Sequence, residues 1–223
     1  MTGIRVAPER RREFSRRLRT WYAKHRRDLP WRETRDPYRV LVSELMLQQT
    51  PVSRVVGFYG RFLERFPTLE SLAASRPRDV RRAWEGLGYY ARARNLHALA
   101  RTVVAETSPA RLPADPVALR ALPGIGPYTA GAVASFAFEQ RASLVDTNVE
   151  RVLRRVFAPR LVPKSARTQR LIWALAEVLL PRSGKAAWTH NQALMELGAL
   201  VCTARVKHCT RCPVRATCAS VES

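Results

Sequence analysis

Residues 122–149 read LPGIGPYTAGAVASFAFEQRASLVDTNV, with a glycine-rich turn at one end and an isolated carboxylate at the other. Gly124 and Gly126 flank one residue and are followed by Pro127, which suits the first position of a helix because its missing N–H would be unpaired there. The two glycines permit positive φ and leave room for a ligand to approach. Such a turn aims backbone N–H groups at an anion, for example a DNA phosphate. An ordinary turn between two helices would have the same Gly-x-Gly pattern.

Asp146 closes this stretch and lies just before a run with helical spacing, NVERVLRRVF. A carboxylate at the start of a helix is stabilised in its charged form by the helix dipole and by unpaired N–H groups. The position therefore fits an ionised catalytic group. It equally fits a residue that only caps the helix.

A second carboxylate, Glu44, lies in VLVSELMLQQ within residues 38–49, a segment that is nearly all apolar. A helix of this composition is buried on most sides, which predicts a desolvated Glu44. Desolvation raises the pKa of a carboxyl group, as a general acid at neutral pH requires. A buried Glu satisfied by a neighbouring donor would have the same surroundings.

Composition restricts the class of protein. The chain has 223 residues, enough for one large or two small domains, and its 46% hydrophobic content can fill a core. The formal net charge of +21 and the isoelectric point near 11.4 predict polyanionic partners, nucleic acid first. No segment shows sustained alternation of polar and apolar residues, so we predict an all-α fold.

The N-terminal residues lack the apolar run of a signal peptide, and no stretch has the length of a membrane span. We therefore expect a soluble, cytoplasmic protein without a membrane partner. In a reducing compartment, cysteines serve more often as metal ligands or free thiols than as disulfides.

Four cysteines near the C-terminus follow the spacing C-x6-C-x2-C-x5-C: Cys202, Cys209, Cys212 and Cys218. Four thiolates in so short a span can close round one metal centre and order a loop that lacks a core. The spacing alone does not separate a zinc ion from a four-iron cluster.

Several motifs together resemble a known family. The LPGIGPYTAG turn, the VDTNV segment and the terminal cysteines resemble the helix-hairpin-helix DNA glycosylases that carry an iron-sulfur cluster. Within that superfamily, SELMLQQT, GLGYYARARNL and NQALMELGALVC resemble the MutY-type adenine glycosylases. The resemblance extends from Trp21 to Cys218.

The resemblance implies an all-α fold of two lobes. One is a six-helix barrel of residues 31–138, and the other combines residues 1–30 and 139–223. The loop 202–218 would hold a [4Fe-4S] cluster through its four cysteines. The expected partner is double-stranded DNA with a mismatch or lesion, lying between the lobes of a monomer.

Residue by residue, the resemblance implies a catalytic pair. Glu44 matches the family's acid and Asp146 its carboxylate. Asn148 matches an asparagine beside that aspartate. Tyr128 stands where related bifunctional enzymes have the lysine that forms a Schiff base.

The resemblance also implies DNA contacts outside the turn formed by Gly124 and Gly126. Gln49 matches a glutamine that enters the base stack, and Tyr89 matches a tyrosine that wedges beside the opposite base. Arg32 and Leu47 match residues near the flipped adenine.

Together these matches predict a monofunctional enzyme of base excision repair that hydrolyses the N-glycosidic bond of adenine opposite guanine or 8-oxoguanine. Two departures bear on its specificity. Thr147 occupies a position that is usually glycine. The chain ends soon after Cys218, which leads us to expect that the C-terminal domain that helps the family to read 8-oxoguanine is lacking.

Two other functions stay open. Compact relatives with similar active sites, including a Tyr at the hairpin, remove thymine or uracil opposite guanine, although QQT and GLGYY favour the adenine enzymes. A non-catalytic DNA-binding module would need the hairpin and the cluster but has no use for the pair Glu44 and Asp146.

Overall fold

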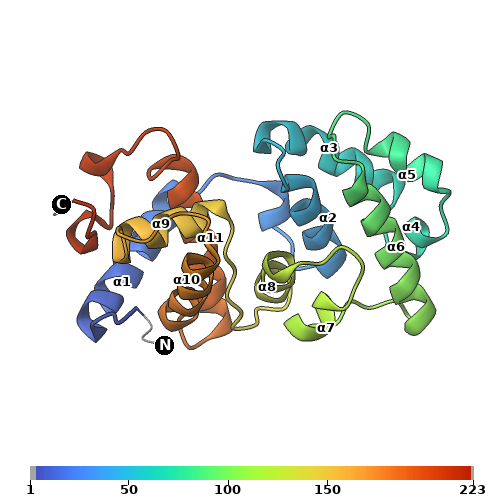
Figure 1. Cartoon of the computed structure of the whole chain (residues 1–223). Helices are drawn as coiled ribbons and strands as arrows, with labels where there is room; N and C mark the ends of the chain where they lie inside the picture. The colour runs from blue at the N-terminus through green and yellow to red at the C-terminus, as the bar shows by residue number, and fades with distance from the viewer. Residues whose placement is uncertain (1–3, 222–223) are drawn as a thin grey trace. The chain divides into compact units, whose positions relative to one another are not determined.

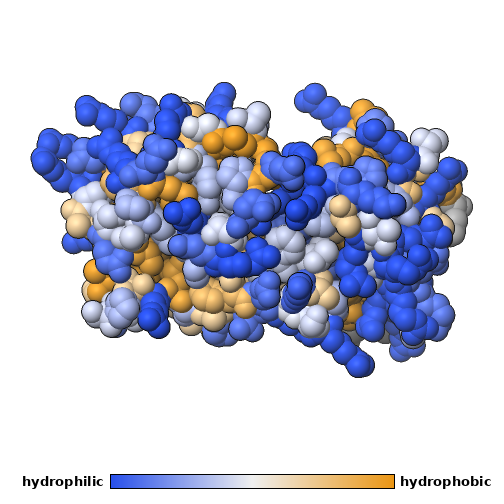
Figure 2. Space-filling view, turned by 180° about the vertical axis from the view of Figure 1, so that it is seen from behind, coloured by the Kyte–Doolittle hydropathy of each residue, from blue (hydrophilic) through white to orange (hydrophobic). Residues whose placement is uncertain are grey.

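The computed structural model describes residues 4–221, which form α-helices, short 3₁₀ helices and one isolated β-bridge between Cys202 and Lys207 (Figure 1). The predicted all-α fold class is confirmed. No helix within these residues is both long and apolar enough to cross a membrane. The face drawn in Figure 2 carries mostly hydrophilic side chains, in keeping with the 39 Lys and Arg residues of the chain.

The chain divides into two compact units, Asp28–Phe138 and the combination of Met1–Arg27 with Glu139–Ser223. The first border follows Arg27, whereas the sequence analysis places it after residue 30. Leu29 explains the difference: it is buried, and its carbonyl accepts a 2.9 Å hydrogen bond from the backbone N–H of Arg32. It therefore belongs with the 3₁₀ turn that follows it.

The unit Asp28–Phe138 is built round one apolar helix, α2. Leu41, Val42 and Met46 on α2 have no exposed surface, and the helix packs against α3, α6 and α8. In Figure 1, α2 and α8 lie side by side. The elements of this unit are η1 (Pro30–Arg32), α2 (Pro37–Leu47), α3 (Val52–Arg65), α4 (Leu69–Ala73), α5 (Pro77–Ala83), α6 (Ala91–Glu106), α7 (Pro116–Arg120) and α8 (Pro127–Phe136).

The other unit packs α1 against α11 and α9 against both α10 and α11. Phe14 of α1 meets Phe157 edge to face, with ring centroids 5.0 Å apart. Arg10 of α1 donates to the carbonyl oxygens of Val156 and Thr217, at 2.8 Å each, and so ties the C-terminal loop to this core. Its elements are α1 (Pro8–His25), α9 (Thr147–Phe157), α10 (Ala166–Leu179), α11 (Gly184–Leu200), η2 (Cys209–Arg211) and η3 (Arg215–Thr217).

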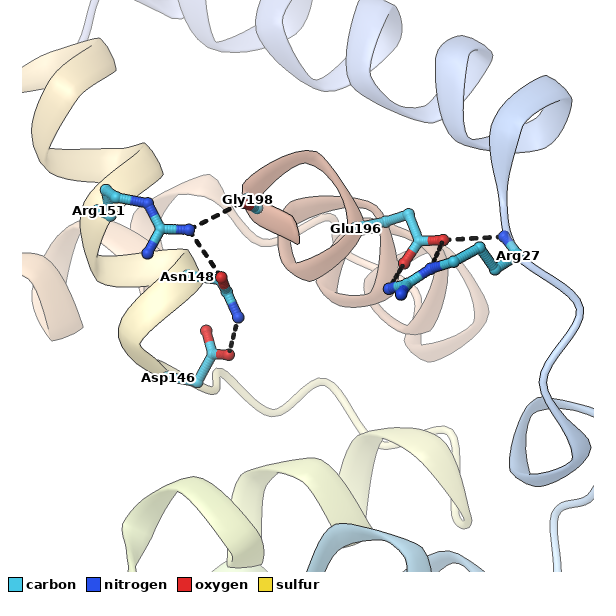
Figure 3. Close-up of polar contacts among 6 residues, drawn as sticks. All are labelled: Arg27, Asp146, Asn148, Arg151, Glu196 and Gly198. Atoms are coloured by element: carbon cyan, nitrogen blue, oxygen red, sulfur yellow. Dashed lines mark hydrogen bonds and ion pairs between the residues drawn. The ribbon is translucent and has the colours of Figure 1, made fainter. Parts of the chain in front are cut away.

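An ion pair fixes the chain after α1 to α11. The carboxylate of Glu196 is fully buried and accepts hydrogen bonds from the backbone N–H of Arg27 at 2.8 Å and from its guanidinium at 2.9 and 2.7 Å (Figure 3). A buried carboxylate needs such a cationic partner because its desolvation is costly. The pair anchors the last residue of this unit before the chain enters the other one.

The glycine turn before α8 uses its two glycines differently. Gly124 has φ +75°, and a Cβ there would lie 2.5 Å from Cβ of Asn95. Gly126 has φ −86°, which any residue adopts, and a Cβ there would meet nothing within 4 Å. The expectation of positive φ therefore holds for Gly124 alone. Gly126 keeps open space in front of the first turn of α8.

Replacing Gly124 with Ala is expected to destabilise the unit Asp28–Phe138 by about 1–3 kcal/mol, because the backbone is left-handed and the new Cβ collides with Asn95. Gly126→Ala is the matched control and is expected to change stability by less than about 1 kcal/mol. Urea unfolding of both variants measures the difference. Equal losses at the two positions would show that the turn does not depend on the conformation of Gly124.

Candidate active-site residues and cysteine-lined cavity

Glu44 lies on α2 and is only 3% exposed, as its apolar helix predicts. Tyr128, in the first turn of α8, donates its hydroxyl hydrogen to Oε2 of Glu44 across 2.7 Å. The packing of α2 on α8 brings the two side chains together. The predicted acid and the residue in the lysine position thus form one hydrogen-bonded pair.

The other residues predicted beside the flipped base are also in this unit. Arg32 of η1 is buried, and Leu47, the last residue of α2, is half-buried. The helix was expected to continue through Gln49 but ends at Leu47. Gln49 is exposed and has φ +57°, which is incompatible with a right-handed helix.

Gln49 and Tyr89 share an uncommon backbone conformation. Tyr89 has φ +48° and is 58% exposed. Left-handed residues other than glycine cost free energy and persist only where their surroundings hold them. Both predicted DNA-intercalating residues are therefore held in an exposed, strained turn.

Arg92, which the sequence analysis did not single out, holds both turns. The side chain is buried and connects the end of α2 with the loop before α6. One guanidinium nitrogen donates to carbonyl oxygens at the end of α2, where helical carbonyls lack intrahelical partners. The carbonyls bound by the guanidinium belong to Leu45, Met46, Gln48, Leu87 and Gly88.

Asp146 precedes α9 and caps it. Its carboxylate accepts hydrogen bonds from the backbone N–H of Val149 at 2.7 Å and from Nδ2 of Asn148 at 2.8 Å. Burial nevertheless raises the pKa of Asp146, while these two donors lower it by a smaller amount. The helix start favours the charged form through these donors, but desolvation has the larger effect on the pKa.

A short chain of hydrogen bonds continues from Asp146 (Figure 3). Arg151 donates to Oδ1 of Asn148 at 2.7 Å and to the carbonyl oxygens of Gly198 and Cys202 at 2.8 Å each. A Cβ on Gly198 would lie 2.6 Å from Cβ of Asn148, so only glycine allows this approach. Asn148 is thus oriented by groups that the sequence analysis missed.

Thr147 begins α9 with an ordinary helical backbone, so this position needs no glycine. The carbonyl oxygen of Thr147 accepts a hydrogen bond from Arg151 at 3.2 Å. The departure from the family pattern leaves the start of α9 intact.

The four cysteines line one cavity, together with Arg155 and apolar residues of α9 and α11. Burial and the neighbouring thiols raise the pKa of Cys212 to about 11, with smaller contributions from the thiols than from burial. Nη1 of Arg155 lies 3.4 Å from Sγ of Cys202. Within residues 4–221, no three Cys, His, Asp or Glu side chains converge into a closed metal-binding group. The four thiols and the adjacent guanidinium still suit a thiolate-bound metal centre, which is electron-rich.

The candidate residues therefore fall into two sets. Glu44 pairs with Tyr128 in one unit, and Asp146 pairs with Asn148 in the other. The cysteine cavity belongs to the same unit as Asp146.

Residues 42–177, more than half of the chain, match the family described as HhH-GPD superfamily base excision DNA repair protein. The chain belongs to this superfamily.

Adenine DNA glycosylases are similar over most of the chain. The rat protein is 44% identical over 214 residues, which is 92% of this chain and 41% of the rat protein. The enzyme of Mycolicibacterium smegmatis is 47% identical over 199 residues, 88% of this chain and 66% of the relative. The chain thus spans less than two thirds of the length of these curated relatives.

Among solved structures, a thermostable thymine-DNA glycosylase is 32% identical, with a TM-score of 0.86 over 96% of this chain and 97% of that one. Endonuclease III in a trapped covalent complex with DNA is 22% identical, with a TM-score of 0.80 over 98% of each chain. The second likeness shows the fold alone.

Proposed function

We propose that the chain is a monofunctional DNA glycosylase that hydrolyses the N-glycosidic bond of mispaired adenine, opposite guanine or 8-oxoguanine. The observation that carries the proposal is the hydrogen bond of 2.7 Å between the half-buried Tyr128 and the buried Glu44. It combines a candidate proton donor with the residue that replaces a Schiff-base lysine. The identity of 43–47% to adenine DNA glycosylases supports the choice of base.

The proposed chemistry divides between two carboxyl groups. A base inside a duplex is out of reach, so the nucleotide must first leave the stack. Protonated Glu44 then donates its proton to the leaving adenine as the N-glycosidic bond breaks, while ionised Asp146 stabilises the positive charge that develops on the sugar, as paired carboxyl groups do in sugar hydrolysis. Water adds to the sugar carbon and releases a proton, which restores protonated Glu44. Asn148 donates to Asp146 and so orients that carboxylate. Arg32 and Leu47 would contact the extruded base.

Double-stranded DNA with a mismatch or lesion is the proposed partner, bound by a single copy of the chain. The backbone N–H groups in front of α8, with open space at Gly126, would bind a phosphate. Gln49 and Tyr89 would enter the stack, since both are exposed at turns that Arg92 holds. Removal of a base needs such wedges to fill the space that the nucleotide leaves.

Tyr128 cannot form a Schiff base with the sugar, so the reaction should stop at an intact abasic site. Treatment with borohydride during the reaction tests this step. We expect no covalent enzyme–DNA adduct, whereas a lysine-dependent enzyme used as a control is trapped. Efficient trapping of this chain would contradict the monofunctional assignment.

We further propose that Cys202, Cys209, Cys212 and Cys218 hold a [4Fe-4S] cluster, supported by the cavity that all four thiols line. When bound, the cluster would order the C-terminal loop through its four thiolates. Elemental analysis of purified protein distinguishes the metals. We expect about four irons with matching sulfide per chain, and stoichiometric zinc instead would contradict the cluster.

Thymine or uracil opposite guanine is the second candidate substrate. The likeness to the thermostable thymine-DNA glycosylase, with 32% identity and a TM-score of 0.86, favours it. Duplexes carrying A, T or U opposite G or 8-oxoguanine, cleaved with alkali after incubation, separate the candidates. Cleavage at adenine supports the proposal, and cleavage at T or U alone supports the second candidate. If no duplex is cleaved, the remaining reading is a DNA-binding module without catalytic activity.

A further inference from the structure

A separate cavity of about 650 Å³ lies between α5 and α6 in the unit Asp28–Phe138. Its volume falls within the range of about 300–1,000 Å³ that is usual for ligand sites. None of the predicted catalytic or DNA-binding residues lines it. The polar and aromatic side chains in its wall are Arg78, Arg81, Tyr90, Arg94, His97 and Arg101.

The wall of this cavity carries positive charge without a carboxylate. Four guanidinium groups line it, and no Asp or Glu is among the described lining residues. The nearby carboxylate of Asp79 forms ion pairs with two arginines outside the cavity, Arg65 at 3.5 Å and Arg76 at 3.9 Å. A concave surface with charge of one sign concentrates ions of the other sign.

His97 also lines this wall. It is 7% exposed, and its Nε2 atom is buried without a hydrogen-bond partner within residues 4–221. Buried polar atoms are normally satisfied, because leaving one unpaired costs free energy. The imidazole lines the cavity, but Nε2 itself has almost no accessible surface and lies behind the wall.

Tyr90 shapes the same wall. The guanidinium carbon of Arg81 lies 5.2 Å from the centroid of the Tyr90 ring, so the two flat groups are in contact. This contact orients Arg81 and leaves its charge uncompensated by a carboxylate, since the ring is neutral.

We propose that this cavity binds a phosphate-bearing ligand. Arginine forks match the geometry of phosphate oxygens and bind them through paired charge-assisted hydrogen bonds. The DNA backbone and a free phosphate ester share this chemistry. The inference goes beyond the proposed function, because binding of phosphate here requires no base excision.

Titration of protein labelled with ¹⁵N-histidine by inorganic pyrophosphate tests the site. We expect a saturable shift of the ring-nitrogen resonances of His97, because this side chain lines the cavity. The double variant Arg78→Ala, Arg101→Ala should weaken binding about tenfold or more, through the loss of two charge-assisted contacts. The matched control Arg111→Ala, Arg120→Ala removes the same charge from exposed positions of the same unit and should weaken binding about twofold or less.

A short undamaged duplex distinguishes the two sources of phosphate. If the duplex displaces pyrophosphate, and if only the cavity variant loses affinity for the duplex, the ligand is the DNA backbone. Duplex binding that leaves the His97 resonance in place identifies a free phosphate ester. No shift of His97 with either probe, or equal weakening in both double variants, would overturn the proposal. Because pyrophosphate binding is read without excision, failure of the proposed glycosylase activity would leave this result intact.

Discussion

Replacing Glu44 with Gln is expected to slow adenine excision by about 10²–10⁴-fold under single-turnover conditions, because the variant loses the proton donor. Binding to a mismatched duplex should stay nearly unchanged, since Gln preserves the shape of the side chain and still accepts a hydrogen bond from Tyr128. Rapid-quench measurement of the excision rate, with binding followed separately by fluorescence anisotropy, distinguishes chemistry from affinity.

Glu64→Gln is the matched control for this variant. Glu64 lies on α3 of the same unit and is exposed, so the control removes a carboxylate without touching the pair of Glu44 and Tyr128. We expect the control to excise adenine at the wild-type rate. A wild-type rate in Glu44→Gln itself would exclude Glu44 as the acid.

Replacing Asp146 with Asn is expected to cause a comparable loss of excision, about 10²-fold or more, because no carboxylate then stabilises the developing positive charge on the sugar. It should also change how stability depends on pH. Burial raises the pKa of Asp146 above its unfolded value. The stability that this group contributes is therefore fully present below the unfolded pKa of about 3.9 and is lost as pH rises through the folded pKa.

The stability advantage of wild type over Asp146→Asn should accordingly be largest in acid and shrink toward neutral pH. Denaturant unfolding at a series of pH values measures this difference. Asp115→Asn provides the matched control, because Asp115 caps α7 through the backbone N–H of Ala118 but is exposed. If the free energy of unfolding of wild type relative to Asp146→Asn increased with pH, desolvation would not be the main influence on the pKa of Asp146.

Local rules predict much of the fold. The first helix, Pro8–His25, follows from the local pattern, because its apolar stripe of Phe14 and Leu18 recurs at helical spacing and proline marks its start. The burial of Glu44 follows from the apolar residues around it. The shared cavity of the cysteines follows from their short spacing, which needs no knowledge of the tertiary structure.

Other features depend on tertiary contacts that leave no local pattern. The left-handed turn at Gln49 ends α2 early. This turn is held by Arg92, which lies 43 residues later in the sequence. In a chain with 39 Lys and Arg residues, no local signal distinguishes Arg92 or Arg151 from solvated arginines. The pKa of Asp146 likewise reflects its burial, which the sequence of its own helix start does not reveal.

A competition in one tube tests the central claim most directly. Two duplexes with different fluorescent labels, one with adenine opposite 8-oxoguanine and one with thymine opposite guanine, are incubated with excess protein, and abasic sites are cleaved with alkali. We predict that adenine is excised about tenfold faster or more, and that Glu44→Gln abolishes this signal. Preferential excision of thymine, or adenine excision that survives in Glu44→Gln, would contradict the account.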